Sequence, residues 1–247
     1  MHDSDATFDL NRGLADLARE LAGETDSGAA FAQLTAHVLA SVEGADGCGI
    51  TLLKASGRLE TVGSTGPDPE AADVLQYRLG DGPCMRSVRK DEVVHVGDLE
   101  VDERWPRWSR PVAERLGYRS VLSAHLFTNG RQVGAVNVYG KRTHAFTAAD
   151  VTHIPFFAAH AAAAIVSVRT IEQLREALVS RTRIGQAEGI VMERFAIDEE
   201  RAFAVLTRLS QHRNEKLRDV AEAVVHDRLP PPDPTLVGGV PEGGASG

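Results

Sequence analysis

Hydrophobic residues recur along the chain at spacings that predict a fold of mixed helices and strands. Near the N-terminus, leucines spaced by four and three residues predict an amphipathic helix over residues 10–22. A second such pattern predicts a helix over residues 29–42, ended by the glycines that follow it. Alternating apolar runs at residues 49–54 and 58–62 predict two strands joined by a Ser-Gly turn. The first part of the chain is therefore expected to contain helices followed by a β-hairpin.

The clearest sheet signal is a second hairpin. Apolar runs at residues 119–127 and 132–139 flank a Thr-Asn-Gly-Arg turn, and Asn-Gly between such runs favours a tight hairpin. The shorter elements expected between the two hairpins are helices at residues 67–79, after the loop at 80–84 and near 111–116, and a strand at 93–96. This order of strands and helices predicts an α+β domain with an antiparallel sheet and flanking helices.

A long helix is predicted after the second hairpin. Thr147 and Asp150 match a capping box, so the helix is expected to start there, to continue to about residue 182, and to kink or restart at Pro155. Along it runs an apolar stripe of Phe157, Ala161, Ala164, Val168 and Ile171, which Leu174 and Leu178 extend. Such a stripe packs either on a partner helix, as in a coiled coil, or on the protein's own sheet. The length of the stripe favours a dimer.

Three short amphipathic helices are predicted next. Their apolar faces lie within residues 184–195, 202–209 and 217–224. Asp198 and Asn214 are expected to cap the second and the third of these helices. Because each helix is apolar on one face only, the three are expected to share the core of a small bundle. Residues 230–247 are rich in proline and glycine without periodicity, which predicts a disordered tail.

Composition and charge narrow the class of protein. The 247 residues are 43% hydrophobic and 25% charged, which excludes a wholly disordered or fibrous chain. The net charge of −8 argues against a generally basic protein that coats nucleic acid. Two cysteines are too few for a disulfide scaffold or a structural zinc site. The sequence contains no run of about 18 apolar residues, so no transmembrane helix is expected. Since the N-terminus is also acidic, unlike a secretory signal, a cytoplasmic protein is expected.

Few residues suggest catalysis. Cys84 follows a Gly-Asp-Gly-Pro loop at an expected helix N-terminus, which would lower the pKa of its thiol, and with Cys48 it could form a redox pair. Burial of both cysteines as small apolar residues is the favoured interpretation. Cys84, His95 and His125 are candidates for contact with a sensor ligand, although sheltered histidines bonded to the backbone are the simpler interpretation. No phosphate loop, nucleophile elbow or zinc-protease motif occurs, so no catalytic residue, cofactor or metal is predicted.

Two regions resemble known families. The segment Ser180-Arg-Thr-Arg-Ile-Gly-Gln-Ala-Glu-Gly-Ile-Val-Met-Glu-Arg-Phe resembles the first helix of ANTAR domains, and two further blocks follow in family-like order up to about residue 226. The Leu79-Gly-Asp-Gly-Pro-Cys loop and the Phe146-Thr-Ala-Ala-Asp helix start resemble those of GAF domains. The resemblance implies a GAF-like sensor domain (28–168) and a linking helix end with the ANTAR domain (169–229), and the patterns above add an N-terminal helical segment (1–27) and the tail (230–247).

The resemblance also implies a function, that of an RNA-binding transcription antitermination regulator. A dimeric ANTAR domain would bind stem-loops in nascent RNA, under control of a GAF-like domain that senses an unidentified small molecule or a protein. The implied RNA-binding residues are Arg181, Gln186, Gly189, Arg213, Asn214, Lys216 and Arg218. Glycines 185 and 189 would allow close approach of RNA or of a neighbouring helix. At Glu188 the chain departs from the many relatives that carry lysine, and a carboxylate there would repel phosphate.

Two alternatives remain open from the sequence. One is a GAF-fold enzyme of the methionine sulfoxide reductase kind, for which only Cys48 and Cys84 could supply the thiols. The other is a signalling module that acts only through protein partners, with the helical bundle as its docking surface. Turnover of a sulfoxide substrate would indicate the first, and capture of proteins without RNA would indicate the second. A regulator without enzymatic activity, free of membranes, is the favoured interpretation.

Overall fold

The computed structural model describes residues 26–90, 92–128 and 130–226. They divide into two compact units, of which the first ends at Glu172 and the second begins at Gln173. The helix expected at residues 10–22 and the tail expected at residues 230–247 lie outside the described residues.

The first unit is built on a five-stranded antiparallel sheet in the order β2-β1-β5-β4-β3. Its strands are β1 (Gly47–Leu53), β2 (Leu59–Ser64), β3 (Val94–Val96), β4 (Ser120–Thr128) and β5 (Arg131–Gly140). Both predicted hairpins are confirmed, because β1 pairs with β2 and β4 pairs with β5. At the second turn Gly130 has a φ of 71°, a conformation that side chains disfavour, which accounts for glycine at this position. The predicted α+β fold with an antiparallel sheet is confirmed.

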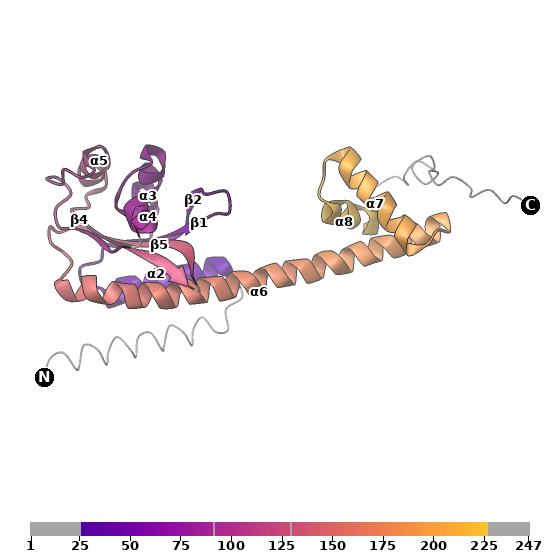
Figure 1. The fold of residues 1–247 in the computed structure, drawn as a ribbon, viewed down its shortest axis with the longest axis horizontal. Helices are drawn as coiled ribbons and strands as arrows, with labels where there is room; N and C mark the ends of the chain where they lie inside the picture. Colours follow the sequence, from indigo (N-terminus) through magenta and orange to yellow (C-terminus); the bar gives the residue numbers. More distant parts are fainter. Residues whose placement is uncertain (1–25, 91, 129, 227–247) are drawn as a thin grey trace, which may run out of the picture. The chain divides into compact units, whose positions relative to one another are not determined.

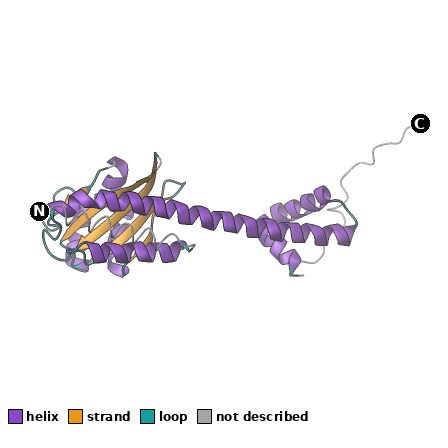
Figure 2. Cartoon of the chain, turned by 90° about the horizontal axis from the view of Figure 1, so that it is seen from below, coloured by secondary structure: helices purple, strands orange, loops and turns teal. Residues whose placement is uncertain are grey.

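Helices α2 (Ser27–Ser41) and the first part of α6 (Ala148–Phe195) cover one face of this sheet (Figures 1 and 2). The core between them and the strands includes the buried side chains of Leu34, Ile50, Leu122, Val138, Phe157 and Ile165. The predicted capping box is confirmed at the start of α6. The Thr147 N–H donates to Asp150 Oδ2 at 2.7 Å, and the Asp150 N–H donates to Thr147 Oγ1 at 3.2 Å.

Helix α6 is longer than predicted. At Pro155, where a kink or a restart is expected, the helix does not restart, and it continues past residue 182 to Phe195 as one helix of 48 residues. The prediction of a separate helix from residue 184 is therefore wrong. No breaker stands between the two predicted segments, and one glycine at position 185 costs a helix only about 1 kcal/mol. The apolar stripe from Phe157 to Val168 packs on the protein's own sheet, so only its later part is open to a partner helix.

Helices α3 (Pro67–Leu79), α4 (Pro83–Lys90) and α5 (Pro106–Leu116) lie on the other face of the sheet, above it in Figure 1. Helix α5 begins five residues earlier than predicted. Pro106 stands in the first turn, where the missing N–H costs no hydrogen bond, so the proline starts the helix. This start places Trp108 in the core, where its indole Nε1–H donates to the carbonyl oxygen of Ala72 at 2.9 Å.

The second unit is a bundle of three helices: the last part of α6, α7 (Glu199–Arg213) and α8 (Leu217–Val225). Its core consists of the buried residues Ala187, Val191, Ala202, Val205, Leu206, Leu209, Val220, Ala221 and Val224. The predicted bundle is confirmed, with the end of α6 as its first helix. Asp198 caps α7 as expected, since its Oδ1 accepts the Arg201 N–H at 2.9 Å.

Asn214 does not cap α8, so this prediction is wrong. It is the C-terminal cap of α7, with φ 53° and ψ 36°, and its N–H bonds back to Gln211 and Ser210. Asparagine is one of the few residues that tolerate this left-handed conformation, so it occurs at helix C-caps. Its side chain also makes it a common N-cap, and the sequence alone does not distinguish the two roles. Lys216 precedes α8 instead, and it makes no side-chain cap.

Among the described residues, α6 alone is long and apolar enough to cross a membrane by length and composition, with a mean hydropathy of 1.6 over its most apolar window. The sequence analysis expected no segment of this length and hydropathy, so it did not anticipate this property of α6. Of that window, 39% is buried inside the protein, with side chains such as Ile165 in the core of the first unit.

Candidate functional site

A cluster of polar side chains is buried between the sheet and helices α3 and α4. At its centre lies Asp73 of α3, whose side chain is fully buried. Its Oδ1 accepts hydrogen bonds from the Tyr139 hydroxyl at 2.5 Å and from Asn137 Nδ2 at 2.9 Å, and its Oδ2 accepts one from Thr61 Oγ1 at 3.3 Å. Glycine at position 49 makes room for this carboxyl, because a Cβ there would lie 2.4 Å from Asp73 Oδ2.

The cluster extends from Asp73 toward α4 through hydroxyl groups. The Tyr77 hydroxyl lies 2.6 Å from Thr51 Oγ1 and 2.8 Å from Thr61 Oγ1. Thr51 Oγ1 in turn lies 3.6 Å from Cys84 Sγ. The main-chain N–H of Cys84 donates to Gln76 Oε1 at 2.7 Å, so Gln76 of α3 holds the start of α4. One connected network therefore joins α3, α4 and the three strands β1, β2 and β5.

Burial dominates the electrostatics of this cluster. It raises the pKa of Asp73 to about 7, against the hydrogen bonds from Tyr139, Thr61 and Asn137, which favour the ionised form. It also raises the pKa of the Cys84 thiol to about 12, with the nearby Asp73 as a second cause. The lowered thiol pKa that the helix N-terminus suggested is thus not found, and Cys84 is a buried thiol.

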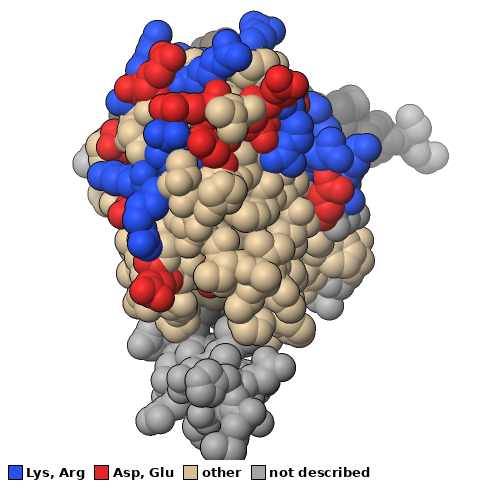
Figure 3. All heavy atoms as spheres, turned by 90° about the vertical axis from the view of Figure 1, so that its left-hand side faces the viewer, with Lys and Arg blue, Asp and Glu red and all other residues tan. Residues whose placement is uncertain are grey.

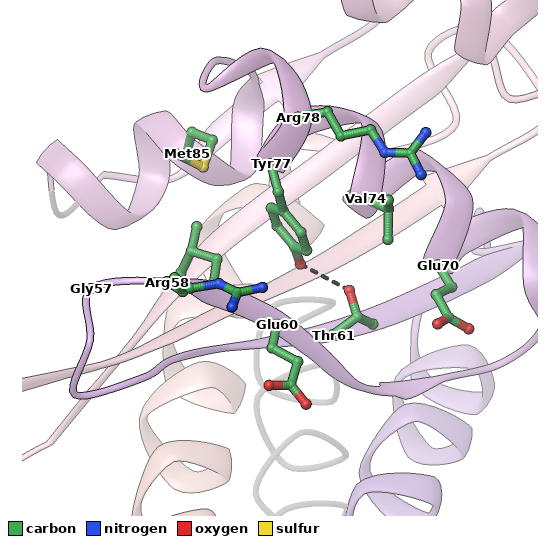
Figure 4. A pocket seen from close by; sticks show the side chains of 10 residues that line it. Gly57, Arg58, Glu60, Thr61, Glu70, Val74, Tyr77, Arg78 and Met85 are labelled. Carbon is green, nitrogen blue, oxygen red and sulfur yellow. Dashed lines mark hydrogen bonds between the residues drawn. The ribbon is translucent and has the colours of Figure 1, made fainter.

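A pocket of about 540 Å³ opens beside the cluster, between the β1–β2 hairpin and α3 (Figure 4). Its lining includes two arginines, Arg58 and Arg78, and two glutamates, Glu60 and Glu70. Tyr77 and Thr61 line it as well, and Figure 4 shows the hydrogen bond between their hydroxyl groups. The pocket therefore shares two residues with the buried network.

The structure does not bring the three sensor-ligand candidates together. His125 pairs across the sheet with Ala135, which packs against Cys84, so these two candidates share the face that carries α4. His95 lies on the opposite face, where its ring meets the edge of Phe146 at 6.2 Å between centroids. Burial lowers the pKa of His95. His95 Nε2 and His125 Nδ1 are buried without a hydrogen-bond partner among the described residues, and neither residue lines the pocket.

The sheet also separates the two cysteines. Cys48 lies in the core beneath α2 and α6, and Cys84 lies on the other face with Val88 and Ala135. Both thiols are buried, and burial raises the pKa of each. The favoured interpretation of both as small buried residues is confirmed, and a disulfide between them would need one side chain to pass through the sheet.

In the second unit, the predicted RNA-binding residues fall on two surfaces. Arg213, Asn214, Lys216 and Arg218 are all exposed at the junction of α7 and α8. Arg218 Nε lies 3.4 Å from Asp219 Oδ1, whereas Arg213 and Lys216 have no ion-pair partner in the described part of the chain. The junction therefore presents cationic side chains to solvent. We call these four residues the basic junction.

Gln186 of α6 is linked to α8 by Arg183, a residue that the sequence analysis did not single out. Arg183 Nη1 donates to Gln186 Oε1 at 3.3 Å, and Arg183 Nε lies 3.0 Å from Glu222 Oε2 on α8. Glu222 follows Arg218 by one helical turn. The signal for Arg183 was available in the sequence, because it precedes Gln186 by three residues on the same helix face.

Arg181 and Gly189 lie on a different flank of α6. At about 100° per residue, they fall with Gly185, Leu174 and Leu178 on the side opposite the buried Ala187. A Cβ added at Gly185 or Gly189 would meet nothing within 4 Å, so this flank is open. We call it the outer flank of α6. Glu188 is half-buried, and burial together with the nearby Glu199 raises the pKa of its carboxyl.

The surface of the first unit offers no comparable concentration of one charge on the face that Figure 3 shows, where blue and red spheres alternate. Several of its cations are paired, such as Arg104 with Asp102 and Arg119 with Asp98. Within residues 26–90, 92–128 and 130–226, no group of three histidines, cysteines, aspartates or glutamates could hold a metal ion. The candidate sites are therefore the buried network with its pocket, and the basic junction.

Comparisons with known proteins agree with this division. The GAF domain family model matches residues 25–166, and the ANTAR domain family model matches residues 172–225. No protein of curated function matches the sequence. A free methionine-R-sulfoxide reductase of Neisseria meningitidis, solved with its substrate, is similar at 21% identity and a TM-score of 0.52, covering 67% of this chain and 93% of that one. The GAF domain of an Acinetobacter phosphoenolpyruvate-protein phosphotransferase is similar at 19% identity and a TM-score of 0.53, covering 64% and 93%.

The structural likeness shows the fold of the first unit, at identities too low to carry an activity. The family matches carry more, because the GAF model alone spans more than half of the chain and the ANTAR model spans the helices of the second unit. The chain is therefore a GAF and ANTAR domain-containing protein.

Proposed function

We propose that the chain is a cytoplasmic RNA-binding regulator of transcription antitermination. In this proposal the GAF unit receives a signal from a small molecule or a protein, and a dimer of ANTAR units binds stem-loops in nascent RNA. The observation that carries it is the basic junction, where Arg213, Lys216 and Arg218 stand exposed around one tight turn. Cations at such a turn suit the phosphates of an RNA loop.

The chemistry of the junction supports contacts to bases as well as to phosphates. Asn214 caps α7 through its backbone N–H, so its exposed side-chain amide remains available for a base edge. Lys216 makes no side-chain cap on α8, so N–H groups in the first turn of that helix can donate to a phosphate oxygen. Gln186 is close to α8 through Arg183 and could add a second amide.

The outer flank of α6 supports the dimer. Leu174 and Leu178 of the second unit are 60% and 67% exposed, which is costly for two leucines one turn apart. A second copy of the same helix would cover them. Gly185 and Gly189 continue this flank without side chains, so we assign them to close helix approach, and Arg181 would border the dimer contact.

The regulator is preferred over a cysteine-dependent reductase. Such an enzyme needs an accessible thiolate, whereas both cysteines of this chain are buried on opposite faces of the sheet with raised thiol pKa values. The reductases among the similar structures share the GAF fold, and that fold serves many functions.

The double variant Lys216→Ala/Arg218→Ala tests the RNA-binding surface. We expect its affinity for an RNA with two stem-loops to fall about tenfold at moderate salt. The slope of log K against log salt should fall by about one unit for each cation that contacts a phosphate. Fluorescence anisotropy with labelled RNA over a series of salt concentrations measures both quantities.

The matched control is Arg194→Ala/Arg201→Ala, which removes two exposed cations near the other end of α7. It changes the net charge equally and should change affinity by less than about threefold, since salt screens charges beyond about 10 Å. Equal losses in the two double variants would mean that only net charge matters. If the wild-type protein ignores the RNA even at low salt, the chain acts through protein partners instead.

A further inference from the structure

The carboxyl group of Asp73 lies where a negative charge has no counterpart. Its side chain is 0% exposed, and its recorded donors are two hydroxyl groups and an amide. The titratable groups that interact electrostatically with it are Tyr139 on β5, Tyr118 ahead of β4, Cys84 on α4, and Glu70 and Tyr77 on α3 itself, together with Cys48 on the opposite face of the sheet. None of these groups carries a positive charge, so none offsets an ionised Asp73.

The hydrogen bonds around Asp73 form a chain that can run in two directions. An ionised carboxylate only accepts, so Thr61 must then donate to Asp73 Oδ2. The Tyr77 hydroxyl must in turn donate to Thr61, and Thr51 must donate to Tyr77. A protonated Oδ2 can donate to Thr61 instead, and every hydroxyl of the chain then turns around. The Cys84 thiol, which otherwise donates to Thr51 Oγ1 at 3.6 Å, would then accept from the Thr51 hydroxyl.

This chain reaches solvent at one place. Thr61 and Tyr77 belong to the chain and also line the pocket of about 540 Å³ between the β1–β2 hairpin and α3 (Figure 4). A proton therefore has a path of hydroxyl groups from the pocket to the buried carboxyl. The same two residues join α3 to strand β2, so the state of the chain bears directly on how this helix packs on the sheet.

We propose that Asp73 is a proton switch of the GAF unit. When Asp73 takes up a proton through Thr61, α3 packs firmly on the sheet. When Asp73 loses it, the buried charge loosens α3 and the wall of the pocket that Tyr77 forms. As an input to RNA binding this switch rests on the proposed sensor role of the unit, but the switch itself is independent of RNA and is tested without it.

The test is the pH dependence of unfolding of the full-length protein. Urea unfolding is followed by the fluorescence of Trp105 and Trp108, the two tryptophans, which both lie in the GAF unit. Burial raises the pKa of Asp73 from 3.8 to about 7, so the folded state holds this proton more tightly than the unfolded state. The contribution of Asp73 to stability is then largest at acidic pH. The unfolding constant should rise by up to about tenfold per pH unit between about pH 4 and about pH 7, and level off above.

Asp73→Asn mimics the protonated carboxyl and should lose this dependence, so its profile between about pH 5 and about pH 8 should be flatter than that of the wild type. The matched control Asp68→Asn removes an exposed carboxylate from the same helix and should keep the wild-type profile. Parallel profiles of wild type and Asp73→Asn would overturn the proposal.

A second measurement decides the matter if Asp73→Asn does not fold. Infrared spectra of the wild type should show the C=O band of a protonated buried carboxyl at about pH 6, and this band should vanish at about pH 8. Tyr139→Phe removes a donor to the ionised form, so it should shift the loss of the band to higher pH. Absence of the band at about pH 6 would refute the switch, whatever the RNA binding assays show.

Discussion

The variant Leu178→Asp is expected to convert the proposed dimer into a monomer and to weaken its binding to a two-stem-loop RNA by about 100-fold or more. Leu178 is 67% exposed on the outer flank of α6, and in the proposed dimer it faces its own copy. Two carboxylates brought together there would each lose water without gaining a partner. Sedimentation analysis measures the change of mass, and anisotropy with labelled RNA measures the affinity.

A neighbouring residue provides the matched control. Val179 is 62% exposed on the same helix, but it points about 100° away from Leu178. Val179→Asp should leave both the dimer and the RNA affinity near the wild-type values. A single stem-loop adds a second check, because the monomeric Leu178→Asp protein should bind it as well as the wild type does. A dimeric Leu178→Asp protein, or a monomeric Val179→Asp protein, would contradict the assignment of the outer flank.

Local signals in the sequence predict most of the secondary structure. The β4–β5 hairpin, the Thr147–Asp150 capping box and the Asp198 cap all appear in the structure as expected, since each depends on contacts within a few residues. The failures come where one residue type serves two opposite purposes. The sequence pattern places Pro106 before a helix that this proline in fact starts, and it predicts that Asn214 opens a helix, whereas Asn214 closes the preceding one.

The buried network around Asp73 could not be predicted from local sequence signals. Asp73 lies in a helix whose sequence is typical of an ordinary polar segment, and its partners Asn137 and Tyr139 are more than sixty residues away in the chain. The pairing becomes visible only when β5 is placed against α3. The strand itself carried a partial signal, because Asn137 alternates with Val136 and Val138, so one face of β5 had to bury a polar group or expose it.

The residues of the basic junction, in contrast, could be predicted from the sequence. The resemblance to ANTAR domains supplied Arg213, Lys216 and Arg218, and the structure places all three at one exposed turn. It also separates Gly189 from them, because the helix turns by about 100° per residue and sets that glycine on the outer flank with Leu178. Spacing along one helix could have distinguished the two surfaces, had the buried position of Ala187 been known as the reference.

Trp108→Ala is expected to lower the free energy of unfolding of the GAF unit by about 3–5 kcal/mol, the usual cost of removing a buried tryptophan. Trp108 is 1% exposed, and it lies in the core that α5 forms with α3 and the sheet. Its indole also donates to the Ala72 carbonyl at 2.9 Å, next to Asp73 in the chain. Urea unfolding measures the loss. The fluorescence of Trp105, the one tryptophan left in this variant, reports on the GAF unit alone.

Two further variants separate the causes of that loss. Trp108→Phe keeps an aromatic ring but no N–H donor, so it should cost clearly less than alanine if the cavity dominates, and nearly as much if the bond to Ala72 dominates. Val101→Ala removes an apolar side chain that is 72% exposed and should change stability by less than about 0.5 kcal/mol. Helix α3 carries both the Trp108 contact and Asp73. If Trp108→Phe loosens this helix, the free energy of unfolding of the variant should also depend less on pH than that of the wild type. The tryptophan and the carboxyl would then stabilise the same helix, and their effects on unfolding would not add.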